Sequence, residues 1–318
     1  MITVLTNHNI MYNVAQVAAD IVHEYQLTGS AVIHLNHEGP CARSIELYDL
    51  LDYICNKYAF DKTKISICTC NALEAHDEYA IEILPQHWIR ATKHSIEELG
   101  YTTNYFQNKD VTKNLFGCLY NAPTWYRLCL LSHVKFDTAS QSLLGCNPTF
   151  AERQYNTVSL DAVVENALPE LDNVINYIKT NPVPVCGAVT NKPIVGLTLN
   201  APAAFYNEFF VDVVAETYTL GMTFFMTEKT IRPIYALTPF ITYGPQGFLS
   251  GLRGRYGFKT FGQWWDESYD DCQQYDRIKK IYQVIDYLDT LTSSDRINMY
   301  AQMQDTLAHN AHILANLT

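Results

Sequence analysis

FFMTEKTIRPIYALTPFITYGPQG, at residues 224–247, contains in one run a polar turn, a helix start, an apolar strand and a Gly-rich turn. The turn TEK at 227–229 precedes the predicted helix, and the apolar run at 239–243 is typical of a buried strand. The motif GPQG at 244–247 then ends that strand. This order of helix, strand and turn is one unit of an alternation that extends over much of the chain.

The residues at the start of this helix have the chemistry to hold a nucleotide diphosphate. Lys229 and the helix N-terminus both offset the negative charge of a pyrophosphate, and Glu228 can accept hydrogen bonds from ribose or sugar hydroxyls. Thr227 completes the polar turn, and Gly244 opens the Gly-rich turn to which the strand returns. The alternative interpretation is an ordinary capping box at the start of a surface helix.

Length and composition indicate a soluble, globular protein with more than one domain. The chain has 318 residues, of which 48% are hydrophobic and 13% aromatic, so it can bury substantial cores. No apolar run approaches the ~18–20 residues of a membrane span, and the start MITVLTNHNI is typical of a strand rather than a signal peptide. We therefore expect a cytoplasmic protein without a membrane partner.

Charge and cysteine usage narrow the function classes further. Lys plus Arg number 22 and Asp plus Glu 33, and the net charge of −11 opposes broad nonspecific binding to nucleic acid. The 9 cysteines lie mostly in apolar runs, without paired CxxC motifs or a His/Cys spacing typical of zinc. We therefore expect neither a disulfide scaffold nor a bound metal. We expect the protein to work in a reducing compartment.

Strands and helices alternate in the first half of the chain, which predicts a parallel, doubly wound α/β sheet. The expected strands lie at 2–6, 30–35 and 64–70, and the expected helices at 11–26 and 44–58.

A second unit is expected from about Asn114. Its expected strands lie at 115–120, 209–218, 239–243 and 257–261, and its helices at 125–133, 160–178, 275–290 and 294–316. A Pro-rich patch at 181–193 interrupts it. The predicted organisation is a Rossmann-like acceptor domain at 1–114, a donor-binding domain at 115–290, and a C-terminal helix at 291–318 that packs back on the first domain.

The second unit resembles the donor-binding half of the α-1,3-fucosyltransferase family and its phage-encoded relatives. FMTEK at 225–229 stands where the family has Asp/Tyr-Val-Thr-Glu-Lys, and Glu216 follows a strand just upstream, as in the family. Asn121 is followed six residues later by Arg127, a spacing found in the first helix of the family's donor domain. The resemblance extends over residues 115–290.

This resemblance implies the GT-B architecture, in which two Rossmann-like domains form an active site in the cleft between them and bind the donor without a metal. It implies that Arg127 and Lys229 bind the diphosphate and that Glu228 contacts the ribose. Glu216 is either a structural carboxylate or an acceptor for a sugar hydroxyl. The family's tyrosine is Phe225 here, which leaves open whether the donor is GDP-fucose.

An inverting transfer needs a general base, which we expect to come from the N-terminal domain. Glu38, in the loop after the expected strand at 30–35, is the first candidate. His8, in the loop after the first expected strand, is the rival. For each, the alternative is a polar loop residue without a catalytic role.

Arg253 belongs to the basic run GLRGRYGFK at 251–259. It is a candidate to assist the diphosphate or to reach the acceptor, and the alternative is a solvated surface. Together with Trp264 and Trp265, this run is also a candidate for a local DNA-binding groove.

The predicted function is therefore a glycosyltransferase, inverting and metal-independent, that needs no cofactor beyond a nucleotide-diphosphate sugar as donor. Its acceptor is a glycan or a hydroxymethylated base of phage DNA, the second of which implies the host cytoplasm. Two alternatives stay open on the same fold: a nucleotide-sugar-binding protein that has lost catalysis, and a virion-associated protein.

Overall fold

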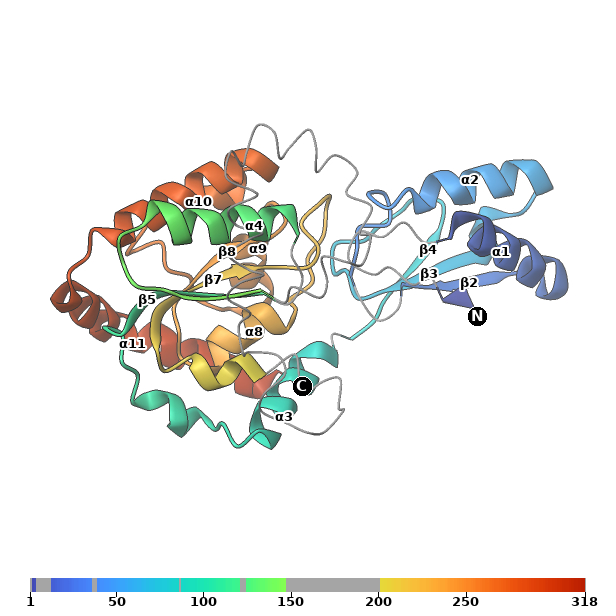
Figure 1. Cartoon of the computed structure of the whole chain (residues 1–318). Helices are drawn as coiled ribbons and strands as arrows, with labels where there is room; N and C mark the ends of the chain where they lie inside the picture. The colour runs from blue at the N-terminus through green and yellow to red at the C-terminus, as the bar shows by residue number, and fades with distance from the viewer. Residues whose placement is uncertain are drawn as a thin grey trace. The chain divides into compact units, whose positions relative to one another are not determined.

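The computed structural model describes residues 2–3, 13–35, 39–85, 87–120, 124–146 and 201–317. The chain divides into two compact units (Figure 1): the first is Met1–His87 with Thr217–Phe225, and the second is Trp88–Glu216 with Met226–Thr318. The chain therefore passes between the units three times. The sequence-based limits of 1–114, 115–290 and 291–318 stay predictions.

The first unit contains a parallel sheet with the strand order β1-β2-β3-β4. Its strands are β1 (Ile2–Thr3), β2 (Ala31–His34), β3 (Ile65–Thr69) and β4 (Ala80–Ile83). Helix α1 (Val14–Thr28) leads into β2, and helix α2 (Leu47–Tyr58) lies between β2 and β3 in the chain. The Asn13 side chain caps α1 by accepting a hydrogen bond from the Gln16 N–H at 3.1 Å, and Gly29 ends it with a φ of 77°.

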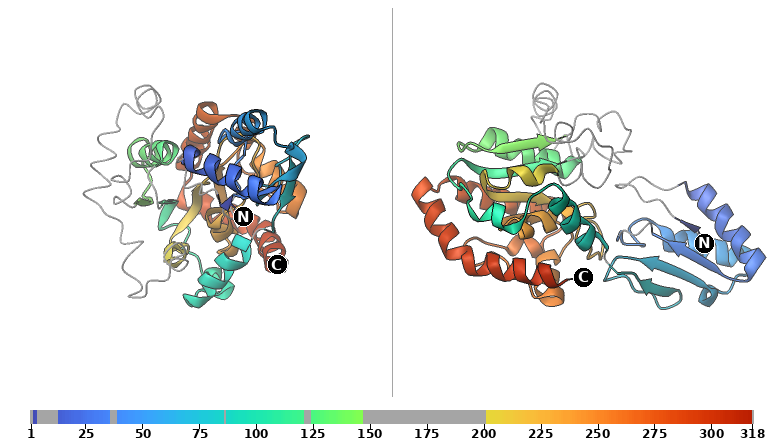
Figure 2. Two further views of the ribbon diagram at one scale, coloured as in Figure 1. Left: turned by 90° about the vertical axis from the view of Figure 1, so that its right-hand side faces the viewer. Right: turned by 90° about the horizontal axis from the view of Figure 1, so that it is seen from below.

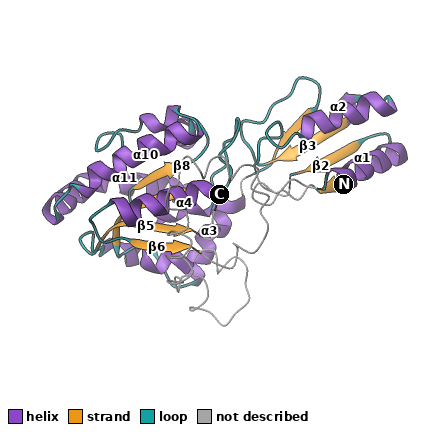
Figure 3. Cartoon of the chain, turned by 45° about the horizontal axis from the view of Figure 1, so that its top comes forward, coloured by secondary structure: helices purple, strands orange, loops and turns teal. Residues whose placement is uncertain are grey.

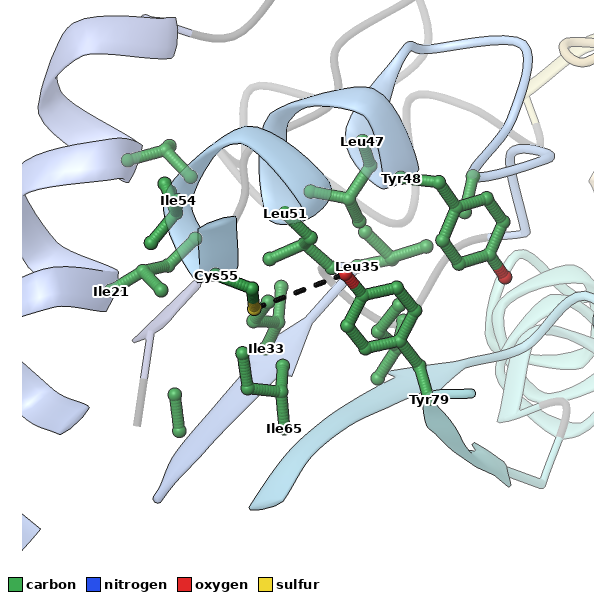
Figure 4. Packing of buried hydrophobic residues seen from close by; sticks show 14 residues of the cluster. Ile21, Ile33, Leu35, Leu47, Tyr48, Leu51, Ile54, Cys55, Ile65 and Tyr79 are labelled. Carbon is green, nitrogen blue, oxygen red and sulfur yellow. Dashed lines mark hydrogen bonds between the residues drawn. The ribbon is translucent and has the colours of Figure 1, made fainter. Parts of the chain in front are cut away.

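Every second residue of β2 and β3 contributes its side chain to the core of this unit. Ile33 and Ile65 point toward the helices, where they meet Ile21 of α1 and Leu51 of α2 (Figure 4). Both helices pack against this one cluster, so they cover the same face of the sheet. The expectation of a doubly wound sheet is therefore not met among the described residues of this unit, because its strand order follows the chain and never reverses.

Residues 217–225, here called the inserted segment, belong to the first unit although both neighbouring segments belong to the second. Asn71, which follows β3 and is fully buried, holds it. The Asn71 amide donates to the carbonyl of Met222 at 3.0 Å, and its oxygen accepts from the Phe224 N–H at 2.9 Å. Glu74 accepts a hydrogen bond from the same amide at 3.1 Å, so this carboxylate has a structural role.

The second unit contains a second parallel sheet, with the strand order β6-β5-β7-β8. Its strands, orange in Figure 3, are β5 (Asn114–Tyr120), β6 (Leu143–Cys146), β7 (Phe209–Ala215) and β8 (Phe240–Tyr243). Every residue of β5, β7 and β8 is buried, as expected for parallel strands covered on both faces.

Helices cover both faces of this second sheet. Helices α4 (Trp125–Ser132) and α10 (Gln274–Asp289) contact each other on one face, and α8 (Glu228–Tyr235) and α11 (Ser293–Asn316) contact each other on the other (Figure 1). Helix α11, red in Figure 2, donates from the Tyr300 hydroxyl to the Leu237 carbonyl at 3.0 Å. The remaining described α-helices of this unit are α3 (His87–Glu98) and α9 (Phe248–Gly251).

The α/β class with parallel sheets is confirmed, and so are the expected helices near 275–290 and 294–316. The strand expected at 257–261 is wrong, since these residues have no strand conformation. The helix expected at 160–178 and the Pro-rich patch at 181–193 lie outside the described residues. The packing of the C-terminal helix on the first domain stays a prediction.

Candidate functional site

The strand order of the second sheet reverses between β5 and β7. The chain runs from β5 through α4 to β6 on one side, whereas β7 pairs with the other side of β5 and leads through α8 to β8. Such a reversal is the topological switch point of a doubly wound sheet, and ligands bind there beyond the carboxyl ends of the strands. Those ends are Tyr120 of β5 and Ala215 of β7.

Glu216, the first residue after β7, is buried and fixes the start of α8. Its Oε2 accepts a hydrogen bond from the Thr227 hydroxyl at 2.5 Å, and its Oε1 accepts one from the Thr230 hydroxyl at 2.5 Å. The Thr227 N–H also donates to Oε1, at 3.3 Å. Thr227 is the N-cap of α8 and accepts from the Lys229 N–H at 3.3 Å. The structural interpretation of Glu216 therefore accounts for both of its oxygens.

Arg127 lies in the first turn of α4 and is 1% exposed. Its guanidinium donates to the carbonyl of Ala215, the last residue of β7, at 3.2 Å. The neighbouring Tyr126 donates from its hydroxyl to the carbonyl of Glu216 at 3.0 Å. Two consecutive residues of α4 thus bind the carbonyl of the last residue of β7 and the carbonyl that follows it, and they hold a cation at the switch point.

Glu228 and Lys229 form a buried ion pair at the start of α8. Lys229 Nζ lies 2.6 Å from Glu228 Oε1, and the two side chains are only 9% and 8% exposed. Arg232, one helical turn further along and also buried, adds a positive charge that acts on Glu228. With Arg127 and Glu216, the charged side chains here are three cations and two carboxylates.

The pKa shifts reflect this surplus of positive charge. Burial alone would raise the pKa of Glu228, but the charges of Lys229 and Arg232 outweigh it and hold that pKa at about 2. Burial lowers the pKa of Lys229, and the charge of Arg127 lowers it further against the attraction of Glu228. A site that favours the ionised carboxylate and disfavours the ammonium suits an additional anion.

The structure therefore brings together five of the residues singled out from the sequence, here called the switch-point cluster: Arg127, Glu216, Thr227, Glu228 and Lys229.

Two other candidates lie apart from the contacts of this cluster. Gly244 follows β8, where an added Cβ would lie 3.0 Å from the Phe248 ring. Arg253 is half-exposed and pairs with Glu267 at 3.2 Å, as expected for the surface interpretation. Glu38, His8 and Asn121 lie outside the described residues, so the assignment of the general base stays a prediction.

Sequence reasoning missed Arg232 and Thr230. Arg232 lies four residues after Glu228, which places both on one face of a helix, and this spacing was an available signal. Thr230 had no comparable signal, because its partner Glu216 is fourteen residues earlier in the chain.

Two further findings concern the residues that the structure describes. Among them, no group of three or more His, Cys, Asp or Glu side chains is arranged to hold a metal ion. In the same residues, no helix has both the length and the apolar character needed to cross a membrane.

Fold and site together define an α/β protein with two parallel sheets and a buried charged cluster at a switch point. Comparisons with protein-family models, curated proteins and solved structures found no significant match to this chain.

Proposed function

We propose that the protein is a glycosyltransferase with a GT-B fold that moves a sugar from a nucleotide-diphosphate donor to an acceptor hydroxyl. The observation that carries the proposal is the switch-point cluster, with its buried cations at the carboxyl ends of parallel strands. Buried ion pairs contribute little to stability, because the cost of removing the charges from water offsets their attraction. Several such charges in one place are therefore better explained by a ligand.

Each residue of the cluster has a proposed role. Arg127 and Lys229 bind the diphosphate, and the N-terminus of α8 adds its dipole to their charge. Glu228 accepts hydrogen bonds from the ribose and holds the Lys229 ammonium in place before the donor arrives. Glu216 is a positioning residue, since its hydrogen bonds fix the turn that carries Glu228 and Lys229.

The same cations suit the chemistry of the transfer. As the bond from the anomeric carbon to the diphosphate breaks, negative charge grows on the leaving oxygen, and fixed positive charges stabilise it without a metal. A general base then takes the proton of the acceptor hydroxyl as that oxygen attacks from the opposite face. Glu38 is the proposed base and His8 the alternative.

Phe225, which stands at the position of the family's tyrosine, is buried in the first unit. It is 3% exposed and packs beside Tyr218, with ring centroids 6.2 Å apart. Its side chain serves packing, which supports a donor that makes no contact with a hydroxyl at this position.

Calorimetric titration with GDP and UDP tests the donor site. Lys229→Met removes a charge-assisted phosphate contact, which should weaken binding by on the order of 10- to 100-fold. Lys113→Met is the matched control, because Lys113 is an exposed lysine paired with Glu208 at 2.7 Å. Equal affinity of the Lys229 variant and the parent for both nucleotides would remove the donor site from the proposal.

A second experiment separates transfer from binding. The release of nucleoside diphosphate from GDP- and UDP-sugars is measured with oligosaccharides or hydroxymethylated DNA as acceptors. Glu38→Gln should retain donor affinity while turnover falls roughly 10²–10⁴-fold. Donor binding by the parent without release on any acceptor would favour the catalytically inactive nucleotide-sugar-binding protein instead.

A further inference from the structure

Outside the switch-point cluster, the second unit has a cavity of about 250 Å³ between α10 and the turn at residues 264–266. Its apolar lining comes from Trp264, Val284 and Tyr287. Trp264 is half-buried and Tyr287 is 44% exposed, so part of each side chain is accessible to a ligand.

The aromatic lining is anchored to the core of the sheet. Trp264 lies against Phe261 with ring centroids 6.1 Å apart, and Phe261 meets Phe240 of β8 edge-on at 5.2 Å. The Trp264 ring therefore rests on a fixed support. A rigid aromatic surface loses little conformational entropy when a ligand covers it.

Three polar groups of different kinds complete the lining: Asp266, Lys280 and Gln283. Asp266 accepts hydrogen bonds from the N–H and hydroxyl of Ser268 at 2.8 and 2.7 Å, and these bonds lower the pKa of its carboxyl. Lys280 donates to the same hydroxyl at 2.9 Å. The lining thus has one anion, one cation and one amide, and its net charge is zero.

These features select the chemistry of a ligand. A phosphate is opposed by Asp266, and a wholly apolar ligand would remove water from three polar groups without replacing their hydrogen bonds. The volume lies below the ~300–1,000 Å³ of pockets for drug-sized ligands, so it suits a single ring. Neutral sugars combine an apolar C–H face, which packs on an aromatic ring, with hydroxyls that both donate and accept.

We propose that this cavity binds one neutral sugar ring, with its C–H face on Trp264 and Tyr287 and its hydroxyls at Asp266, Lys280 and Gln283. Trp265 also lines the cavity and is itself buried, so it adds to the apolar wall.

The inference does not rest on the proposed transfer reaction, because the cavity is built from residues outside the switch-point cluster. In a glycosyltransferase it would hold a sugar unit of the acceptor glycan away from the reacting bond. In a protein without catalysis it would be a lectin-type site.

Saturation-transfer NMR tests the cavity with the methyl glycosides of glucose, galactose, mannose and N-acetylglucosamine. Adenine, uracil and inorganic phosphate are the competing probes. We expect the parent to bind at least one methyl glycoside, and Trp264→Ala to weaken that binding roughly tenfold or more, the order of a lost aromatic contact.

Tyr275→Ala is the matched control, since Tyr275 also lies on α10, is 40% exposed and does not line the cavity. This variant and Lys229→Met should both retain sugar binding, and the second separates the cavity from the donor site. The proposal is overturned if no methyl glycoside binds, if binding survives Trp264→Ala, or if only the nucleobases or phosphate bind.

Discussion

The Thr227 hydroxyl donates a 2.5 Å hydrogen bond to Oε2 of Glu216, which joins the N-cap of α8 to the end of β7. The two residues are eleven positions apart, and the inserted segment lies between them. Because Glu228 and Lys229 follow Thr227 directly, this hydrogen bond fixes the position of the helix start that carries the buried ion pair. Glu216 thus acts on the candidate site through the backbone of α8.

Glu216→Ala should therefore destabilise the protein. It leaves the hydroxyls of Thr227 and Thr230 buried without their carboxylate acceptor, which costs about 1–3 kcal/mol in the free energy of unfolding. Urea denaturation followed by circular dichroism measures the change. Glu208→Ala removes a partly exposed carboxylate paired with Lys113 and should cost ~0–1 kcal/mol. Equal losses in the two variants would show that Glu216 has no special structural role.

Lys229→Met should change how stability depends on acidity. The folded-state pKa of Glu228, about 2, lies below its ordinary value of 4.5, so this group stabilises the fold above pH 4.5 and loses its contribution as the pH falls toward 2. Removing the Lys229 charge raises the pKa of Glu228 and reduces that loss. The stability difference between parent and variant should shrink by on the order of 1–3 kcal/mol on acidification.

Urea midpoints at about pH 5 and about pH 3 provide this measurement. Lys113→Met, at an exposed pair, should show the same difference from the parent at both pH values. A difference that stays constant for Lys229→Met would contradict the assigned ion pair.

Lys109→Met should remove a pH dependence of the free energy of unfolding between about pH 7 and pH 10.5. Lys109 is half-buried and donates to the Tyr206 carbonyl and to the Thr238 hydroxyl. Burial lowers its pKa from 10.5 to about 7, so the stability it contributes is present above pH 10.5 and is lost as the pH falls through 7. Between these values, the parent should lose stability on acidification relative to the variant, in chemical denaturation at several pH values. Parallel pH profiles of the two proteins would refute the lowered pKa.

Gly39→Ala should weaken the attachment of the inserted segment. An added Cβ at Gly39 would lie 2.5 Å from the Phe225 Cβ and 3.1 Å from the Asn71 backbone nitrogen. Such overpacking costs about 1–3 kcal/mol, measured by urea denaturation. Gly254→Ala is the control, because its added Cβ meets no atom within 4 Å. The close approach is contradicted if both variants unfold at the same urea concentration.

The elements with a clear apolar period were predictable from the sequence. The run at 239–243 became β8, and the period of the last two helices gave α10 and α11 within a residue or two. β4 was missed because its residues are mostly exposed, and only Ile81 packs against the core of the first unit. A strand with one core residue carries almost no periodic signal.

The strand expected at 257–261 does not form, because side chains rather than a neighbouring strand accept the hydrogen bonds of its backbone. Phe258 and Phe261 are buried and favour strands by propensity, but side chains satisfy the backbone here. The Lys259 N–H donates to Asn310 Oδ1 at 2.8 Å, and the Phe261 N–H donates to Glu267 Oε1 at 2.7 Å. Asn310 is 51 residues from Lys259 and Glu267 is six residues from Phe261, so both acceptors lie outside the run 257–261 and its apolar pattern could not reveal them.

The candidate site was predictable only where its residues are close together in the sequence or belong to a motif with a characteristic spacing. The motif at 225–229 and the position of Arg127 pointed to residues that do lie together. The sequence could not decide whether Glu216 is a structural carboxylate or an acceptor for a sugar hydroxyl. The decision depends on Thr227 lying beside Glu216 in space, although the inserted segment separates them in the chain.

The inserted segment also delays the folding of the unit that is synthesised first. Asn71, Ala72 and Gly39 find hydrogen-bond partners in residues 222–224, which leave the ribosome only after β5, α4 and β6. The unit synthesised first therefore waits, with these polar groups still hydrated, until much of the second has emerged. The first unit can therefore complete its fold only when residue 225 has been made, and a fragment ending near His87 would lack residues 217–225, which belong to its own fold.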